Sequence, residues 1–254
     1  MHKLSDKNED LLVINPNTSP AVTALIDEQV QWAVPSGMTA RTCRVGWGTP
    51  SIETHIDAAV AAVALLDTLA AGVDARGVLV GAFGDPGLLA ARELLDIPVV
   101  GIGESALAEA AERGDFAILT IQPASVPLVR ELVRNNNYED ACVTVEALPV
   151  SVLEAASPAA IRGRLLSVGR ELGRDPRIKS IVLGGAPLGV HAKYLSDQVG
   201  VEFIDPVTAG VKRLAGLATG GSAGHRADSY DQLKRKEFEG NLEFLKHLNQ
   251  TLWR

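Results

Sequence analysis

Two segments that lie about a hundred residues apart in the chain share one distinctive pattern. Each is an apolar, mostly β-branched run that ends in a glycine-rich turn and then reaches a proline: GVLVGAFGDPG, residues 77–87, and SIVLGGAPLG, residues 180–189. The pattern is typical of a parallel strand whose carboxyl end carries a ligand-binding loop, followed by a helix that begins at the proline. Ala82 and Gly185 stand where such a strand would present its first functional side chain, and neither residue can transfer a proton.

Apolar runs and helical patterns alternate along the whole chain. The expected strands are residues 11–15, 39–45, 77–82, 98–102, 116–121, 142–147, 180–184 and 201–204. The expected helices are residues 20–33, 56–69, 86–95, 105–111, 126–136, 159–172, 187–199 and 206–217. This alternation predicts an α/β fold in which helices flank parallel sheets.

The two halves of the chain also resemble each other. Residues 11–20, LLVINPNTSP, match residues 118–127, ILTIQPASVP, and similar β-rich, Ala-rich and glycine-rich segments follow in both halves. Any two βα units can look alike by chance, but the order of these matches favours a duplication with a period of about 105 residues. We therefore expect two similar lobes, each a parallel sheet flanked by helices, related by a pseudo-twofold axis. The strand ends at Asn15, Ala82, Ile121 and Gly185 would then face one cleft.

Lobe one is expected to comprise residues 11–103 and 205–219, with lobe two, residues 104–204, inserted between them. After a glycine-rich breaker at residues 220–224, apolar residues recur mostly at three- and four-residue spacing, which predicts a C-terminal helical tail over residues 225–254. These apolar residues are Leu233, Phe238, Leu242, Leu245, Leu248 and Leu252. The tail either packs on its own lobe or contacts a second subunit, and we expect a homo-oligomer.

Composition excludes several classes of partner. The net charge of −7 and the pI near 5.3 give no basic surface for nucleic acid or an anionic membrane, and 4% aromatic residues argue against base stacking. No apolar run reaches the length of a membrane span and the start of the chain is polar, so a cytoplasmic location is expected. Cys43 and Cys142 are expected to be reduced and unpaired, as small buried apolar residues, and no cysteine or histidine spacing suggests zinc.

Two residues at predicted strand ends could bind a ligand or transfer a proton. Asn15 could donate to a carboxylate or an imide carbonyl, while Thr18 or Ser19 caps the helix that begins at Pro20. Asp85 is expected to be the N-cap of a helix that begins at Pro86, and that structural role is sufficient to explain it. Asp85 could act as a general base only if it turned toward the cleft with a raised pKa.

Histidines supply a second set of candidates. His191 falls in the first turns of the helix after Gly185, and His55 precedes an Ala-rich helix. Histidine is the side chain best suited to proton transfer near neutral pH, although a histidine without an evident partner is more often structural. Weaker candidates of the same kind are Glu53, Lys193 and Tyr194.

Several of these segments together resemble a known family. They are residues 15–19 (NPNTS), 51–55 (SIETH), 83–88 (FGDPGL) with 91–93 (ARE), 98–102 (PVVGI) and 182–184 (VLG). In this order they resemble the hydantoin and allantoin racemases of the aspartate/glutamate racemase superfamily, over residues 11–219. The resemblance implies two α/β lobes with the site between them, no metal and no organic cofactor.

The same resemblance implies a mechanism that this chain lacks. The racemases hold one cysteine at each glycine-rich strand end, and the two thiols work on opposite faces of the carbon because inversion needs an acid and a base there. Those cysteines fall on Ala82 and Gly185, while Cys43 and Cys142 match neither position. The substrate-binding residues implied by the resemblance are Asn15, Ala82, Phe83, Thr120, Ile121, Gly185 and Ala186.

Three functions follow as hypotheses. The first is an enzyme that acts on a hydantoin-like cyclic amide or a small carboxylated compound by non-thiol chemistry, as an isomerase, a lyase or a ring-opening hydrolase, with Asp85 and His191 as catalytic candidates. The second is a non-catalytic protein that keeps the racemase pocket for a small ligand. The third is a hydantoin racemase whose bases are not recognisable in the sequence.

Overall fold

The strands form two parallel four-stranded sheets of identical order. The computed structural model describes residues 9–220, apart from the side chains of residues 158 and 160. The first sheet has the order β2-β1-β3-β4, built from β1 (Glu9–Asn15), β2 (Ala40–Arg44), β3 (Ala75–Val80) and β4 (Val99–Gly101). The second has the order β6-β5-β7-β8, built from β5 (Phe116–Ile121), β6 (Cys142–Leu148), β7 (Ser180–Gly184) and β8 (Glu202–Ile204). The α/β class and the duplicated lobes are therefore confirmed.

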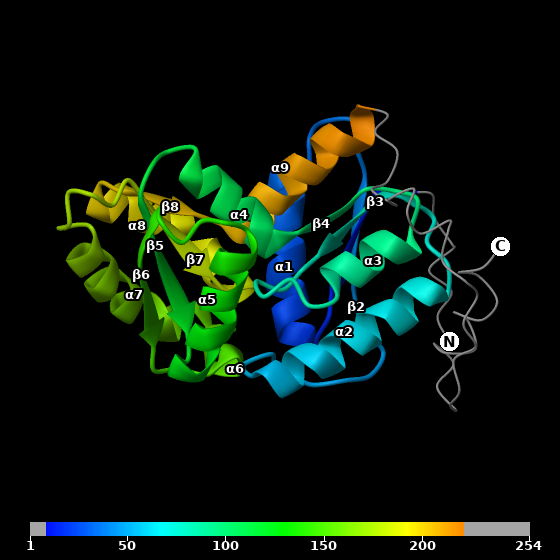
Figure 1. The fold of residues 1–254 in the computed structure, drawn as a ribbon, viewed down its shortest axis with the longest axis horizontal. Coiled ribbons are helices and arrows are strands. Elements are labelled where there is room, and N and C mark those ends of the chain that lie inside the picture. The colour runs from blue at the N-terminus through cyan, green and yellow to red at the C-terminus, as the bar shows by residue number, and fades with distance from the viewer. Residues whose placement is uncertain (1–8, 221–254) are drawn as a thin grey trace.

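Helices cover both sheets and also lie between them. The α-helices are α1 (Pro20–Ala33), α2 (His55–Ala70), α3 (Leu88–Leu94), α4 (Ile102–Ala111), α5 (Val126–Asn135), α6 (Val152–Ala155), α7 (Pro158–Leu172), α8 (Ala192–Val199) and α9 (Pro206–Thr219). Two 3₁₀ turns, η1 (Pro123–Ser125) and η2 (Ala186–His191), precede α5 and α8. Figure 1 shows the lobe of β1–β4 on the right and the lobe of β5–β8 on the left, with α1, α4 and α9 in the middle.

Apolar residues join the two lobes through a shared core. One buried cluster contains Leu11 and Leu79 of the first sheet together with Leu119 and Leu183 of the second, and Val207 of α9 belongs to it as well. Helix α9 packs against α4, α1 and β3, so the last described helix contacts the first lobe again after β8. The lobes are thereby held with the carboxyl ends of their strands facing a common space.

Helix starts differ from the expected ones around the two glycine-rich loops. Helix α3 begins at Leu88 rather than at Pro86, and its N-cap is Gly87, so the expected N-cap role of Asp85 is wrong. Asp85 has a φ of 46° and Gly87 a φ of 76°, so the chain makes a left-handed turn there before the helix can start. In the second loop, the single helix expected over residues 187–199 is divided into η2 and α8.

Two further expectations are corrected by the structure. Helix α4 begins at Ile102, directly after β4, whereas the sequence placed residue 102 in the strand. Cys43 and Cys142 are unpaired as expected, but both are only half-buried.

Several expectations concern features that the described residues do not test. The helical tail over residues 225–254 lies outside them, and the lobe boundaries, the homo-oligomer and the cytoplasmic location stay predictions. Among residues 9–220, none of the helices is both long enough and apolar enough to cross a membrane.

Candidate functional site

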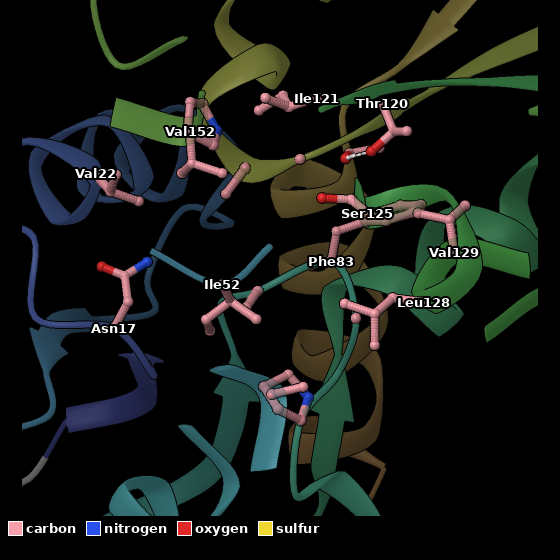
Figure 2. A pocket seen from close by; sticks show the side chains of 18 of the residues that line it. Asn17, Val22, Ile52, Phe83, Thr120, Ile121, Ser125, Leu128, Val129 and Val152 are labelled. Carbon is pink, nitrogen blue, oxygen red and sulfur yellow. Dashed lines mark hydrogen bonds between the residues drawn. The ribbon is translucent and has the colours of Figure 1, made fainter. Parts of the chain in front are cut away.

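A pocket opens between the two lobes at the carboxyl ends of the strands. The pocket is partly open to solvent, and the empty space within it and its mouth together is about 670 Å³. Ala82 lines it from the loop after β3, and Gly185 lines it from the loop after β7. Asn17 follows β1 and Ile121 ends β5, so all four equivalent strand ends contribute to the same pocket (Figure 2).

The lining is uncharged throughout the part of the chain that the structure describes. Its polar side chains are Asn17, Thr120 and Ser125. The remaining residues are glycines and apolar residues, namely Val22, Ile52, Ala58, Gly81, Ala82, Phe83, Gly84, Pro86, Ile121, Leu128, Val129, Val152, Gly184, Gly185, Ala186 and Pro187. An ionic ligand would therefore lose hydration without gaining an opposite charge from this lining.

Asn17, rather than Asn15, presents an amide to the pocket. Asn15 is buried, and its Nδ2 donates to Asn17 Oδ1 (3.0 Å) and to Thr23 Oγ1 (3.0 Å). Asn17 Oδ1 also accepts a hydrogen bond from the Ser19 amide at 2.9 Å. Because its oxygen is occupied by two donors, Asn17 must direct Nδ2 elsewhere, and Figure 2 shows that nitrogen on the side facing Ile52. The strand-end asparagine thus orients its neighbour, which can donate to a ligand.

Serine 19 performs the capping role expected from the sequence. Its Oγ accepts a hydrogen bond from the Val22 amide, and Pro20 is the first residue of α1. This cap fixes the turn that carries Asn17 and brings Val22 into the pocket wall.

The second glycine-rich loop is held from both sides. Thr120 Oγ1 donates to the Gly184 carbonyl at 2.7 Å, and Gln29 Nε2 of α1 donates to the Ala186 carbonyl at 3.0 Å. A Cβ on Gly184 would lie 2.9 Å from the Cβ of Thr120, so glycine is needed for this close approach. Both contacts fix Gly185 between two anchored residues.

The first loop offers backbone donors instead of side chains. The amides of Phe83 and Gly84 donate no hydrogen bond to another described residue, although both residues line the pocket. Amides in this position can bind a carbonyl oxygen or an oxyanion.

Asp85 is engaged in the packing of the first lobe and does not line the pocket. Its two carboxylate oxygens accept from the amides of Gly103 (2.9 Å) and Glu104 (2.7 Å), at the start of α4. Burial raises the pKa of Asp85 to about 8, although these two hydrogen bonds oppose the rise. Proton transfer from Asp85 to a ligand in the pocket would require the loop to break both contacts.

His191 is also buried outside the pocket lining, at the end of η2. Only 1% of it is exposed, and neither ring nitrogen has a hydrogen-bond partner among the described residues. Burial, together with the positive charge of Arg162, lowers the pKa of His191 to about 4. The ring is therefore neutral at physiological pH and is separated from the ligand space.

The weaker candidates lie at the surface or at the contact between the lobes. His55 approaches Glu131 at 3.6 Å, and Lys193 pairs with Asp197 at 3.2 Å. The Tyr194 ring lies under the guanidinium of Arg162, with 4.9 Å from the guanidinium carbon to the ring centroid. Glu53 contacts the second lobe, as described below.

Both cysteines lie away from the pocket. Cys43 belongs to the edge strand β2 and Cys142 begins β6, and neither lines the pocket. Burial raises the pKa of each thiol, to about 11 for Cys142. Within residues 9–220, no three His, Cys, Asp or Glu side chains are grouped as a metal site would require.

Sequence reasoning missed Asn17, Ser125 and Val152. Asn17 stands in the same NPNTS motif as Asn15, but the hydrogen bond that holds its oxygen is not visible in the sequence. Ser125 and Val152 lie in short helical segments, η1 and the start of α6, that no motif marks.

Comparisons with known proteins agree with this architecture. The family model described as Asp/Glu/Hydantoin racemase matches residues 11–214. A hydantoin racemase of Pseudomonas sp. (strain NS671) is 30% identical over 91% of this chain and 94% of its own length, and one of Paenarthrobacter aurescens is 31% identical over 90% and 99%. The structure of an allantoin racemase from Klebsiella pneumoniae is 32% identical, with a TM-score of 0.84 over 93% of this chain and 98% of that one. The chain therefore belongs to the Asp/Glu/hydantoin racemase family.

Proposed function

We propose that the chain binds a small uncharged cyclic amide of the hydantoin type between its lobes and does not transfer a proton of that ligand. The observation that carries the proposal is the lining, in which every described side chain is uncharged. Ala82 and Gly185, at the strand ends where the racemases are expected to hold their thiols, have no acid or base to offer. Names of the similar proteins, which are racemases of hydantoins and allantoin, support the choice of a cyclic amide.

The polar groups of the pocket suit such a ring. Asn17 Nδ2 and the amides of Phe83 and Gly84 are donors for ring carbonyl oxygens, and Ser125 adds a hydroxyl group. The apolar walls can bury the rest of the ligand, as is usual for small-molecule sites.

A second candidate is an enzyme that uses non-thiol chemistry on the same ligand class. The donors that favour it are the same amides of Phe83 and Gly84, because they could stabilise an enolate or a tetrahedral oxyanion. The small residues at 82 and 185 leave space for a water molecule between the loops. In that case the chain would be an isomerase, a lyase or a ring-opening hydrolase.

Isothermal titration with 5-benzylhydantoin and 5-isopropylhydantoin, together with NMR of the same samples in heavy water, tests the proposal. We expect saturable binding, no new product, and exchange of the ligand's α-proton at the rate of buffer alone. Product formation would support the second candidate, and exchange faster than in buffer would support a racemase with unrecognised bases. Failure of both hydantoins to bind would contradict the binding protein, the non-thiol enzyme and the racemase alike.

Asn17→Asp tests the orientation of the ligand. The substitution keeps the oxygen that accepts from Asn15 and Ser19 but replaces the donating nitrogen with a negatively charged oxygen. We expect hydantoin affinity to fall by about tenfold or more, because a ligand carbonyl would face an acceptor. The matched control is Asn135→Asp at the exposed end of α5, which should leave the titration unchanged. If Asn17→Asp and Asn135→Asp bound the hydantoin with equal affinity, Asn17 would not be a ligand-binding residue.

A further inference from the structure

One segment of the first lobe crosses to the second lobe beside the pocket. Residues 49–55, here called the strap, form the second part of the connection from β2 and end at the first residue of α2. The Thr18 amide donates to the Thr49 carbonyl (2.9 Å) at one end of the strap. At the other end Thr54 is the N-cap of α2, in a capping box with Asp57. The Glu53 amide also donates to Asp57 Oδ2 at 3.1 Å, so both ends of the strap are fixed on the first lobe.

The middle of the strap is held by the second lobe. Glu53 Oε1 accepts from the Val152 amide at the start of α6 (3.0 Å), and the Glu53 carbonyl accepts from Ser125 Oγ (3.4 Å). The amide at a helix start is a favourable partner for a carboxylate. The His55–Glu131 contact adds a third link, but both side chains are largely exposed and such pairs contribute little. Figure 1 shows α6 beside the N-terminal end of α2, where the lobes meet.

The groups that hold the strap are themselves pocket residues. Ser125 and Val152 line the pocket from the second lobe, and Ile52, the residue before Glu53, lines it from the strap. A break in the Glu53 contacts would free Ile52 to leave the wall, whereas the lining on β5, on β7 and in the loop after β3 would stay in place. From this arrangement we propose that the strap is a gate in the pocket wall at Ile52, and that Glu53 is the latch that holds the strap against the second lobe.

The Glu53 contacts should limit how fast a ligand enters and leaves the pocket at Ile52. A molecule that enters past Ile52 must wait until the Glu53–Val152 and Ser125–Glu53 hydrogen bonds open together. The rate of access to the deep wall should therefore depend on Glu53, although this side chain is not part of that wall. The inference rests on the ligand site proposed above, but access can be measured without any ligand.

Thiol labelling measures access to the deep wall directly. In the variant Ala82→Cys, a single new thiol lines the pocket, and its reaction with iodoacetamide is followed by peptide mass spectrometry. We expect Glu53→Ala in this background to accelerate the labelling at position 82 by about tenfold, which corresponds to the loss of one charge-assisted hydrogen bond. Glu53→Gln, which keeps an acceptor for the Val152 amide, should give a smaller increase. Glu139→Ala, at an exposed position before β6, is the matched control.

The two native thiols report on general loosening. Cys43 and Cys142 are half-buried outside the pocket, so their labelling should not change in Glu53→Ala if only the strap opens. Equal labelling at position 82 in the Glu53→Ala and Glu139→Ala variants would overturn the proposal, as would labelling of Ala82→Cys at the rate of a free thiol with the strap intact. Gly185→Cys provides a second reporter position in the same pocket if Ala82→Cys does not fold. A hydantoin that does not bind would contradict the proposed function but leave this result standing.

Discussion

The double variant Ala82→Cys with Gly185→Cys should racemise a 5-substituted hydantoin at least about a hundredfold faster than the unmodified chain. Both positions line the same pocket, from the loops after β3 and β7, so two thiols would face a ligand held between the lobes. One thiolate could then remove the α-proton while the opposite thiol returns a proton to the other face. Polarimetry of an optically pure hydantoin measures the rate.

The pocket can accept both side chains with little rearrangement. A Cβ at position 185 would lie 2.9 Å from Cδ1 of Ile121, which is the mobile tip of a flexible side chain. The φ of Gly185 is 172°, which is extended backbone open to any residue. Ala82 already has a Cβ, so only a sulfur atom is added there.

Serine provides the matched control for this variant. Ala82→Ser with Gly185→Ser has nearly the same shape but no group that ionises near neutral pH, so it should remain inactive. Each single cysteine variant should racemise the hydantoin far more slowly than the double variant, because direct inversion needs groups on both faces. A folded, hydantoin-binding double cysteine variant without racemisation would show that the pocket holds the ring in a different orientation from the racemases.

His191 should make the protein sensitive to acid. The folded state keeps its ring neutral, because burial lowers the pKa from 6.5 to about 4. In the unfolded chain this histidine takes up a proton below about pH 6.5, whereas in the folded state it does so only near pH 4. The contribution of His191 to the free energy of unfolding is therefore fully present above pH 6.5 and is lost as the pH falls toward 4. Between pH 7 and pH 4.5 this one histidine should remove about 2.5 kcal/mol from the free energy of unfolding.

His191→Leu isolates this contribution from that of the other titrating groups. Because neither ring nitrogen has a described hydrogen-bond partner, an apolar side chain should leave the stability at pH 7 within about 1 kcal/mol of the unmodified chain. Urea unfolding at both pH values should then show a smaller acid loss in this variant. His55→Leu, at a largely exposed histidine, is the matched control. An unchanged loss in His191→Leu would mean that the ring is protonated or solvated in the folded state.

Much of the fold could be predicted because its signals are local. Strands such as β5 and β7 were located to the residue, since each is a continuous apolar run bounded by turn residues. The start of α3 could not be found in this way, because the left-handed turn at Asp85 depends on contacts with the start of α4, eighteen residues further along the chain. Pro86 predicts a helix start at residue 86, but the left-handed backbone at Asp85 and Gly87 delays the start of α3 to Leu88.

The site was predicted only in outline. Equivalent strand ends were expected to meet in one cleft, and the pocket confirms that geometry with Ala82, Ile121 and Gly185 in its wall. Side-chain direction was not available from the pattern. The sequence predicts Asn15 as the binding residue, whereas its hydrogen bond to Asn17 leaves the amide of Asn17 to face the pocket. The link between Glu53 and Val152 joins residues ninety-nine positions apart and leaves no local trace in the sequence.

The return of α9 to the first lobe has a consequence for synthesis. Helix α9 packs on α1 and β3, yet it is made after every strand of both sheets. During synthesis, the lobe of β1–β4 therefore cannot complete its packing before the lobe of β5–β8 has been made. The β5–β8 sheet can be complete while the β1–β4 sheet still lacks its contact with α9. The apolar surface that α9 covers cannot be buried by this helix until residue 219 has left the exit tunnel.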